Sequence, residues 1–351
     1  MSSRTFGLIV ILLLGSRLCA AAAPGRTPYF GINQDLVWTD DREVPGLIQA
    51  MKEARVQAVR MGVRWTVVEP ERGEWDFSRV DRMVKAVRES KIEILAVLCS
   101  VPSWASEVKP IEGKRFPDCY APKRLEDWQE YVRRCVSRYK GDISYWEIWN
   151  EENGEGYYNP LPNVPEYVGL LKSAYVTAKK ANPKATVVLG GLQMNGIIAN
   201  PWSPCKVENF LRDIYDAGGG PYFDVVNIHP YVLATKDQGP AYCAKLTRDT
   251  VELMKKHGDS KKPLWITETG LAVNANVTEQ MQADHLRGVY REIGRMPQVK
   301  AIYWFLLKDG PAYLNDGTDS MGLISSDGHR RLSFETYKEL AAAGKAKRGD
   351  K

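Results

Sequence analysis

A single closed barrel of eight parallel strands, each followed by a helix, is the α/β fold that this sequence predicts. Short β-prone runs alternate eight times with segments of helical periodicity between residues 28 and 343, which implies parallel pairing through crossover helices. No G-x-G-x-x-G turn follows the first run, which disfavours an open doubly wound sheet. Polar residues also stand at or near the ends of six runs, where barrels of this kind carry their functional groups: Asn33, Arg64, Ser100, Glu151, His229 and Glu268.

The eight strands are expected at runs that are rich in β-branched and aromatic residues. One of them is apolar except for Glu93 near its start, as in a strand that is covered on both faces. The predicted strands cover residues 29–33, 58–65, 92–100, 145–151, 186–191, 224–229, 264–268 and 301–305.

Helices are expected between these strands, where apolar residues recur every three or four positions. Val80, Val84 and Val87 show this spacing in residues 78–90, after a loop over residues 69–77. The loops after the fourth, fifth, sixth and eighth strands are long, and we expect them to elaborate one mouth of the barrel. The predicted helices cover residues 44–54, 78–90, 125–139, 165–181, 207–217, 246–257, 278–295 and 334–343.

Both ends of the chain differ in composition from the barrel. Arg4, a short apolar run and the small residues 19–23 have the arrangement of a secretory signal, so residues 1–23 are expected to be a signal peptide and the protein to be secreted or periplasmic. The apolar run is too short to cross a bilayer and no later stretch is longer, so no membrane span is expected. Residues 28–343 would form the catalytic barrel and residues 344–351 a basic, disordered tail.

The charge of the chain does not indicate a nucleic-acid partner. The formal net charge is +5 at pH 7. Arg4 and Arg17 lie in the expected signal peptide, and four more cations lie with one acid in the tail after Gly344. The folded part is therefore close to neutral, and no nucleic-acid binding is expected. The oligomeric state is left open.

Five cysteines remain once the expected signal peptide is removed, which leaves at least one free thiol even in an oxidising compartment. Cys205 and Cys243 stand in loop-like sequence bounded by Pro and Gly, and we predict a disulfide between them. Cys99 and Cys135 are expected to be small buried hydrophobes, and the pairing of these two and of Cys119 stays open. No Cys and His spacing resembles a metal site, so neither a metal nor another cofactor is expected.

Two stretches each deliver a glutamate to the end of a strand. Residues 145–153 are Tyr-Trp-Glu-Ile-Trp-Asn-Glu-Glu-Asn and place Glu151 after the fourth strand. Residues 264–270 are Leu-Trp-Ile-Thr-Glu-Thr-Gly and place Glu268 at the end of the seventh. The two strand ends face each other across the mouth of a closed barrel. Two carboxyls about 5–5.5 Å apart, one ionised and one protonated, are what retaining hydrolysis of a glycosidic bond requires.

The glutamates on either side of Glu151 are weaker candidates. Glu147 and Glu152 also lie at or beside the fourth strand, but a glutamate in such a position is usually solvated or ion-paired. The same structural reading is the alternative to a catalytic role for Glu151 itself.

The two stretches resemble the catalytic strand ends of glycoside hydrolase clan A, which Trp-Glu-Ile-Trp-Asn-Glu and Trp-Ile-Thr-Glu-Thr-Gly match closely. Family 39 is the nearest, with a family 5-like enzyme as the alternative. Its pattern is similar to Val-Arg-Met-Gly-Val-Arg-Trp and Glu-Pro-Glu-Arg-Gly around the second strand, and to His-Pro-Tyr after the sixth. The resemblance spans residues 28–340. It implies a TIM barrel that cleaves β-linked oligo- or polysaccharide by double displacement, without a cofactor.

The resemblance also implies roles for individual residues. Glu151 would be the general acid/base and Glu268 the nucleophile, with Asn150 bound to the 2-hydroxyl of the sugar. Tyr231 would donate a hydrogen bond to Glu268. A positive charge should keep Glu268 ionised, and Arg60, which matches an arginine on the second strand of the clan, is the first candidate for it.

Further residues are expected around the two carboxyls. Arg64 has the same strand parity as Arg60 and is the alternative partner of Glu268. By resemblance, Trp304 would form the floor of the subsite at the cleavage point, with a cis peptide bond between Trp304 and Phe305. Trp104 is expected to contact sugar.

Asn33 and His229 are also expected to contact sugar, and His229 fits a capped core histidine equally well. Two alternatives to hydrolysis stay open: a carbohydrate-binding barrel without turnover, and a transglycosylase that uses the same two carboxylates. The sugar, its linkage and endo or exo action also stay open, since loops vary without fixing them.

Overall fold

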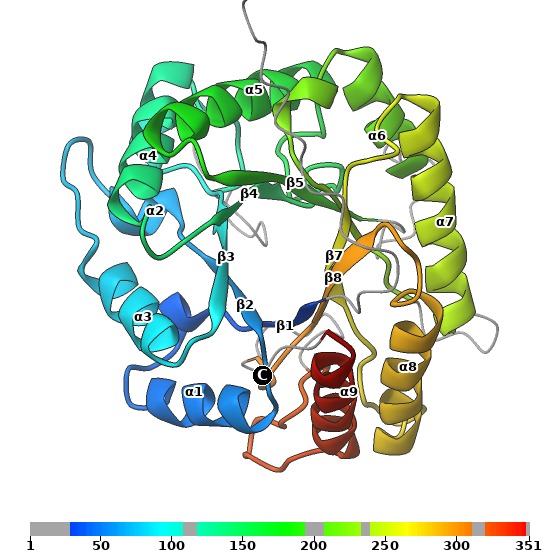
Figure 1. Cartoon of the computed structure of the whole chain (residues 1–351). Coiled ribbons are helices and arrows are strands. Elements are labelled where there is room, and N and C mark those ends of the chain that lie inside the picture. The colour runs from blue at the N-terminus through cyan, green and yellow to red at the C-terminus, as the bar shows by residue number, and fades with distance from the viewer. Residues whose placement is uncertain (1–28, 108–117, 194–206, 233–238, 311–319, 349–351) are drawn as a thin grey trace, which may run out of the picture.

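The structure, a computed structural model, describes residues 29–107, 118–193, 207–232, 239–310 and 320–348, with the backbone alone for 207–209 and 345–348. Its eight strands are parallel and pair in chain order, and the last closes on the first. Figure 1 looks into this barrel and shows the ring of helices around it. The predicted (β/α)8 barrel is therefore confirmed.

The strands and helices alternate along the chain. The strands are β1 (Tyr29–Asn33), β2 (Ala58–Gly62), β3 (Glu93–Leu98), β4 (Tyr145–Asn150), β5 (Thr186–Gln193), β6 (Val226–His229), β7 (Leu264–Thr269) and β8 (Val299–Trp304). The long helices are α1 (Val44–Glu53), α3 (Ser78–Glu89), α4 (Leu125–Arg138), α5 (Val164–Ala181), α6 (Val207–Asp216), α7 (Pro240–Lys256), α8 (Glu279–Glu292) and α9 (Leu332–Arg348). Short helical turns are η1 (Leu36–Trp38), α2 (Trp65–Val68), η2 (Ser103–Ala105) and η3 (Gly220–Tyr222).

Two strands differ in length from the prediction. β2 ends at Gly62 and not at Trp65, because Trp65 begins the helical turn α2. The Trp65 carbonyl accepts a hydrogen bond from the Glu69 amide at 2.9 Å. β5 runs on to Gln193, past the predicted end at Gly191. This extension brings the Gln193 side chain to the mouth of the barrel.

Two helices also differ. α7 begins at Pro240 rather than Leu246, because Gly239 caps it and proline suits the first turn of a helix. α9 continues to Arg348, so the predicted disordered tail is wrong for residues 344–348, which are helical. Residues 349–351 lie outside the described part of the chain.

The predicted disulfide is not supported. Cys243 lies on α7, not in a loop, and it is a buried free thiol that donates to the Pro230 carbonyl at 3.1 Å. Cys205 and the expected signal peptide, residues 1–23, lie outside the described residues. Cys99, Cys119 and Cys135 are free and buried as well.

The barrel is filled by side chains rather than hollow. Gly31 makes room for the Tyr303 ring, because a Cβ at Gly31 would lie 2.3 Å from it. A second and larger core packs between the strands and the helices and includes Ile302 and Trp304. The inner cluster consists of Ala58, Leu95, Val188, Val225, Trp265, Ala301 and Tyr303. This packed interior supports the polar groups at the C-terminal ends of the strands.

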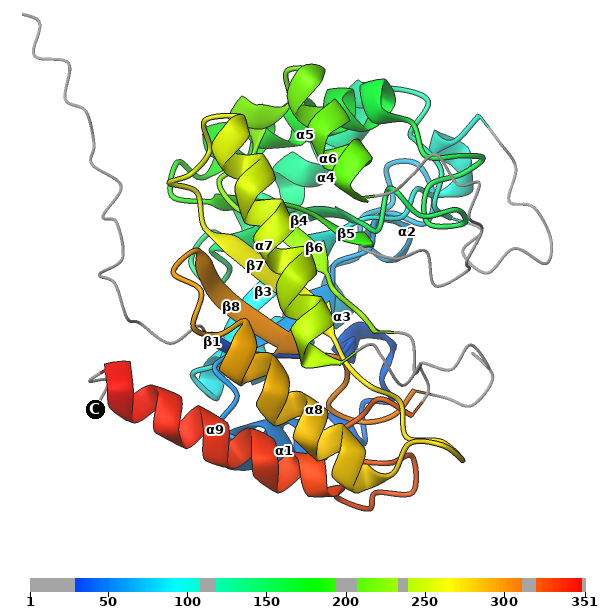
Figure 2. The same ribbon diagram turned by 90° about the vertical axis from the view of Figure 1, so that its right-hand side faces the viewer.

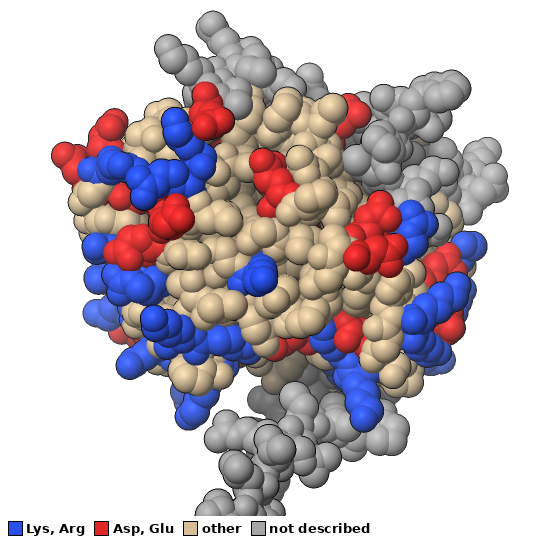
Figure 3. Space-filling view, turned by 90° about the horizontal axis from the view of Figure 1, so that it is seen from above, with Lys and Arg blue, Asp and Glu red and all other residues tan. Residues whose placement is uncertain are grey.

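The outer surface is a ring of helices with charges of both signs. Figure 2 shows the ring from the side, with α8 and α9 packed next to each other. On the face in Figure 3, small groups of acidic and basic side chains alternate across a mostly uncharged surface. On α4, for example, Glu130 binds Arg133 at 2.7 Å and Arg134 at 2.6 Å. Within the described residues, every helix is too short or too polar to cross a membrane.

Candidate active site

The end of β4 carries Glu151 in an unusual backbone conformation. Trp149 has φ of 76° and Glu151 has φ of 52°, a left-handed region that non-glycine residues seldom adopt and in which those that do cluster at functional sites. The turn directs the Trp149 ring outward against Trp128 and Tyr158. Asn150 faces the mouth instead, where it accepts a hydrogen bond from Arg60. The strict alternation of the strand is broken at this point.

The end of β7 carries Glu268 after a similar break. The pairing of β7 with β8 shifts register between Ile266 and Thr269, as at a β-bulge, which re-aims side chains beside active sites. Trp265 points into the barrel and Ile266 outward, so regular alternation would turn Glu268 outward as well. The shift lets Glu268 reach Arg60 on the opposite wall instead.

The structure brings the two predicted carboxyls together. Oxygen atoms of Glu151 and Glu268 and a ring nitrogen of His229 all lie within 4.8 Å of one another. Glu151 is 2% exposed and Glu268 is 7% exposed, so both lie in a site from which most water is excluded. This spacing matches a carboxyl pair in which one member attacks directly, and it leaves no room for an intervening water.

Arg60 and Tyr231 both bind Glu268, as the sequence predicts. Arg60 Nη1 donates to Oε1 at 2.6 Å, and the Tyr231 hydroxyl donates to Oε2 at 2.8 Å. Burial raises the pKa of Tyr231, and the negative charge of Glu268 raises it further, so the phenol keeps the proton that it donates. These contacts stabilise the ionised form of Glu268.

Glu147, which lies on β4 before Glu151, is the main partner of Arg60. The carboxylate is fully buried and receives two parallel hydrogen bonds from Arg60, both 2.8 Å long. Burial opposes the charge of Arg60, but the negative charges of Glu147 and Glu268 outweigh it and raise the pKa of Arg60. Glu147 therefore holds the guanidinium in place and balances its charge. Its inward parity with Tyr145 was a signal that could have indicated this.

Different groups surround Glu151. Gln193 Nε2 donates to Oε2, and His229 Nδ1 lies 2.9 Å from Oε1. His229 Nε2 lies 2.9 Å from the Thr267 hydroxyl, and the ring is almost fully buried. His229 lies between the two carboxyls, 3.8 Å from Glu268. The predicted sugar contact of His229 is therefore not supported. Gln193 was missed because the predicted strand ended too early.

Asn33 and Asn150 both accept from Arg60. Asn33 Oδ1 receives Nη1 at 3.0 Å, while its Nδ2 donates to the Thr267 carbonyl at 2.8 Å. This side chain is buried and fully used, so the prediction that it contacts sugar is wrong. Asn150 Oδ1 receives Nη2 at 2.6 Å, and the residue is only half-buried. Its amide nitrogen is therefore the part of Asn150 that can serve a ligand.

The predicted subsite floor is shifted by one residue. Along β8, Ala301 and Tyr303 belong to the inner cluster, whereas Trp304 belongs to the outer core and donates to the Met321 carbonyl at 3.0 Å. Trp304 is fully buried, so it cannot offer a face to a sugar. Phe305, the next residue of inward parity, is half-buried and meets the Tyr231 ring edge-on at 6.3 Å.

The cis peptide bond is shifted in the same way. The structure has it between Phe305 and Leu306 and not between Trp304 and Phe305. Both differences place Phe305 where the resemblance assigned Trp304. The aromatic side chain at the mouth of β8 is therefore a phenylalanine.

Trp104 and Arg64 lie elsewhere on the same face of the barrel. Trp104 meets Trp65 edge-on and donates to the Glu69 carbonyl at 3.1 Å, and Arg72 stacks on its ring. These contacts use both the edge and a face of the indole, so the predicted sugar contact of Trp104 is not supported. Arg64 does not bind Glu268 among the described contacts; its nearest carboxylate is Asp35, at 3.7 Å.

The three side chains at the centre of the site, Glu151, His229 and Glu268, lie close enough together to surround a metal ion. Each ligand atom already has a partner. Arg60 balances the charge of Glu268, and Thr267 holds the second nitrogen of His229. The donor set therefore suits proton transfer and charge stabilisation better than cation binding.

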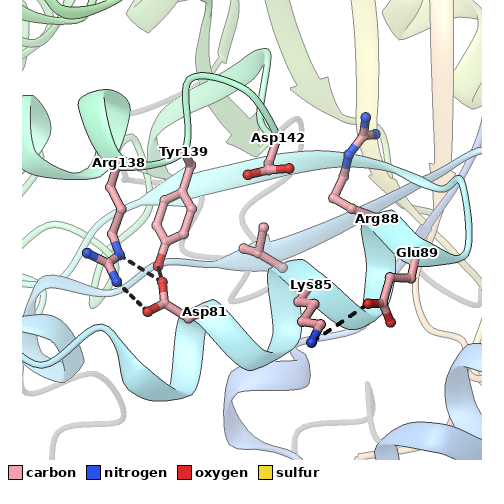
Figure 4. A pocket seen from close by; sticks show the side chains of 8 residues that line it. Asp81, Lys85, Arg88, Glu89, Arg138, Tyr139 and Asp142 are labelled. Atoms are coloured by element: carbon pink, nitrogen blue, oxygen red, sulfur yellow. Dashed lines mark hydrogen bonds and ion pairs between the residues drawn. The ribbon is translucent and has the colours of Figure 1, made fainter.

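A hollow of about 500 Å³ lies outside the barrel between α3 and α4 (Figure 4). Four of its charged groups pair with one another. Asp81 accepts from Arg138 at 2.7 Å and from the Tyr139 hydroxyl at 2.8 Å, and Lys85 lies 3.9 Å from Glu89. The hollow lies on the helical ring and not at the strand ends, so we assign no chemistry to it.

Two family models match this chain. One is described as Beta-galactosidase, of glycoside hydrolase family 42, and matches residues 37–158; the other is described as Glycosyl hydrolase catalytic core and matches residues 174–337. Between them they include both carboxyls and the groups that bind them. These matches support a clan A glycoside hydrolase.

The curated relatives match this chain only in part. It is 30% identical to the beta-galactosidase BbgII of Bifidobacterium bifidum over 139 residues, which are 35% of this chain and 19% of the relative. It is 25% identical to endo-1,4-beta-xylanase A of Xylanibacter ruminicola over 174 residues, 47% of this chain and 44% of the relative. The chain thus spans less than half the length of either.

Solved structures agree with the barrel fold of this chain. A family 39 glycoside hydrolase from the gut symbiont Bacteroides cellulosilyticus WH2 superposes with a TM-score of 0.69 at 21% sequence identity. The match covers 90% of this chain and 64% of the other. At this identity the likeness establishes the barrel.

Proposed function

We propose that this protein is a retaining glycosidase that cleaves a β-linked oligo- or polysaccharide by double displacement, with Glu268 as nucleophile and Glu151 as general acid/base. The observation that carries the proposal is the distance between the two carboxyls, whose oxygens lie within 4.8 Å of each other. A retaining enzyme needs such a short separation, whereas an inverting enzyme needs about 6.5–9.5 Å to admit a water molecule.

The first step transfers the sugar to the enzyme. A Glu268 oxygen bonds to the anomeric carbon while the bond from that carbon to the leaving oxygen breaks, and Glu151 gives its proton to that oxygen. The product is a glycosyl ester on Glu268 with inverted anomeric configuration, and the leaving alcohol departs neutral. Glu151 is left as a carboxylate.

The second step returns the enzyme to its starting state. Glu151 accepts a proton from water, and the water oxygen bonds to the anomeric carbon as the ester bond to Glu268 breaks. The second inversion restores the original anomer. Transfer to the hydroxyl of another sugar would follow the same course, and product analysis with excess acceptor separates the two outcomes.

The surroundings of the two glutamates support this division of roles. Glu268 is bound by a guanidinium and a phenol, both of which stabilise negative charge. Glu151 is bound by the neutral amide of Gln193 and by His229, whose second nitrogen is held by Thr267. A nucleophile must be ionised before it attacks, whereas an acid must first hold a proton, so the stronger positive field belongs with the nucleophile.

The substrate class follows from the relatives and from the site. The matched proteins are named beta-galactosidase and endo-1,4-beta-xylanase, both of which act on β-linked sugars. Phe305 at the mouth offers an apolar ring for the face of a sugar, and Asn150 offers an amide for a hydroxyl. Polymeric substrates of this kind lie outside the cell, in keeping with export through the N-terminal segment.

Azide rescue tests the proposal. The Glu268→Ala and Glu151→Ala variants are assayed with an activated aryl β-glycoside in the presence of sodium azide. The Glu268 variant should form an α-glycosyl azide by a single displacement, and the Glu151 variant a β-glycosyl azide by capture of the glycosyl enzyme. Wild type that shows no turnover on a panel of such glycosides would favour a binding protein, and azides of the opposite configuration would exchange the two roles.

Export is tested separately. Intact mass and N-terminal sequencing of the mature protein should show loss of the first residues, with the new N-terminus shortly after the small residues 19–23. Recovery of the full-length chain from the cell interior would contradict it.

A further inference from the structure

Arg64 is a partly buried arginine, with 27% of its side chain exposed, and its guanidinium is held only loosely. Its Nε lies 3.7 Å from Asp35 and its Nη1 lies 3.9 Å from Asp118, both longer than a hydrogen bond. Nε has no hydrogen-bond partner at all among the described residues, although it is shielded from water. An arginine normally satisfies its donors when it is buried, so the loose arrangement points to a missing partner.

Trp38 lies directly beside this arginine and is exposed. It ends the turn η1 after β1, and 61% of it is exposed, which is unusual for so large an apolar side chain. The Arg64 guanidinium lies 5.8 Å from the centre of the Trp38 ring. One side of the indole is thus fixed by a cation, while more than half of the residue's surface remains available.

The pair lies on the same end of the barrel as the two carboxyls. Trp38 follows β1 and Arg64 follows β2, and all strands are parallel, so their C-terminal ends share one face with those of β4 and β7. In the barrel order, β1 and β2 lie on the arc that joins β7 through β8 to β4 through β3. A chain of sugars bound between Glu151 and Glu268 can therefore extend over this arc.

Backbone contacts tie the arc to the catalytic groups. The Gln34 amide donates to the Arg60 carbonyl at 3.2 Å, and Asp35 accepts from the Gly62 amide at 3.3 Å. Arg60 in turn binds Glu268. The position of Trp38 and Arg64 is thus fixed relative to the cleavage point.

We propose that Trp38 and Arg64 form a distal sugar-binding subsite, which rests on the proposed glycosidase function and extends it to substrates longer than the two residues at the cleaved bond. The apolar face of one sugar ring stacks on Trp38, and its hydroxyls accept hydrogen bonds from the terminal nitrogens of Arg64, whose side chain is 27% exposed. Asp35 and Asp118 flank the arginine and can accept from the same hydroxyls. Their negative charges favour a neutral sugar over a uronic acid.

The test compares substrates that differ only in length. Wild type and Trp38→Ala are assayed on the aryl β-glycoside of a single sugar and on a series of β-linked oligosaccharides of that sugar. The variant should cleave the aryl glycoside like wild type but lose about tenfold in kcat/KM on the longest oligosaccharides, mostly through KM. Trp38→Tyr should restore most of the loss. Arg64→Met should show the same dependence on length, with thermal unfolding checked.

Tyr29→Ala is the matched control, because Tyr29 is an exposed aromatic residue at the opposite end of β1. It should leave both substrates unaffected. A Trp38→Ala variant that equals wild type on long oligosaccharides, or that loses equally on both substrates, would overturn the subsite.

Failure of the glycosidase proposal looks different, because wild type would then not cleave the aryl glycoside. Calorimetric titration with the longest oligosaccharide then decides the subsite: weaker binding by Trp38→Ala supports it, and equal binding overturns it.

Discussion

Arg60 and Glu147 form a two-point ion pair beneath the mouth of the barrel, with both hydrogen bonds 2.8 Å long, and the same guanidinium donates to Glu268 at 2.6 Å. The single positive charge of Arg60 is therefore shared by two carboxylates in a buried site. The ion pair with Glu147 fixes the orientation in which the Arg60 guanidinium donates to Glu268.

Removing Glu147 should destabilise the protein strongly. Glu147→Ala leaves the Arg60 guanidinium buried with one carboxylate fewer, and breaking a buried pair costs about 3–5 kcal/mol. Chemical denaturation with the midpoint and slope measured for each variant checks this. Glu93→Ala is the control, because its ion pair with Arg88 is 30% and 40% exposed and should contribute less than about 1 kcal/mol. Equal effects of the two variants would contradict the structural role of Glu147.

Removing the Tyr231 hydroxyl should impair catalysis without unfolding the protein. Tyr231→Phe deletes a hydrogen bond to a charged carboxylate, which corresponds to a loss of about ten- to a hundredfold in kcat/KM. Tyr290→Phe is the control, because its hydroxyl donates to the Ile302 carbonyl behind the barrel wall. Steady-state kinetics that show no difference between the two variants would remove Tyr231 from the site.

Phe305 and Trp304 should respond in opposite ways. Phe305→Ala removes the aromatic ring at the mouth and should lower kcat/KM by about tenfold with little change in stability. Trp304→Phe removes a buried hydrogen bond to Met321 and should lower stability by about 1–3 kcal/mol with kcat/KM nearly unchanged. The reverse pattern in kinetics and thermal unfolding would restore Trp304 as the subsite floor.

Glu152 should make the protein less stable as the pH rises. It is fully buried, neither oxygen has a hydrogen-bond partner among the described residues, and it lies against Gly190, where a Cβ would be 2.1 Å from it. Burial raises the pKa of Glu152 from its ordinary value of 4.5 to about 8, and the charges of Glu147 and Glu151 act in the same direction. The unfolded chain therefore loses this proton first, and stability falls from about pH 4.5 until about pH 8.

Glu152→Gln tests this dependence. The amide cannot ionise, so the variant should equal wild type in stability near pH 4 and exceed it by up to about 5 kcal/mol at pH 8 and above. Glu155→Gln, an exposed neighbour in the same loop, should show no such gain. Unfolding curves of the three proteins across this pH range check the prediction, and a gain that is the same at both ends would contradict it.

The sequence predicts the barrel and the two central carboxyls well, because both depend on patterns that survive in one dimension. The alternation of strands and helices fixes the barrel, and Glu151 and Glu268 stand at strand ends. Arg60 and Tyr231, which bind Glu268, were implied by the resemblance to clan A.

The sequence could not predict where the backbone departs from regular alternation. The positive φ of Trp149 and the register shift before Thr269 re-aim side chains at β4 and β7, and neither can be recognised from residue types. On β8 the error was the opposite one. Regular alternation, applied from Ala301 and Tyr303, would have selected Phe305 rather than Trp304.

The fate of the buried polar residues was harder to predict. Glu147 and Glu152 are both completely buried. Glu147 is fully hydrogen-bonded, whereas neither Glu152 oxygen has a hydrogen-bond partner among the described residues. The difference depends on residues far away in the chain, Arg60 for the first and Gly190 for the second. Such contacts are set by the closure of the barrel and leave no local pattern.

Trapping the covalent intermediate tests the central claim most directly. A 2-deoxy-2-fluoro β-glycoside with a good leaving group slows the second step more than the first, so the glycosyl enzyme accumulates. Mass spectrometry of the digested protein should find one sugar per chain, on the peptide that carries Glu268. A sugar attached to Glu147, Glu151 or Glu152, or no adduct in a protein that still cleaves the aryl glycoside, would contradict the assignment of Glu268 as the nucleophile.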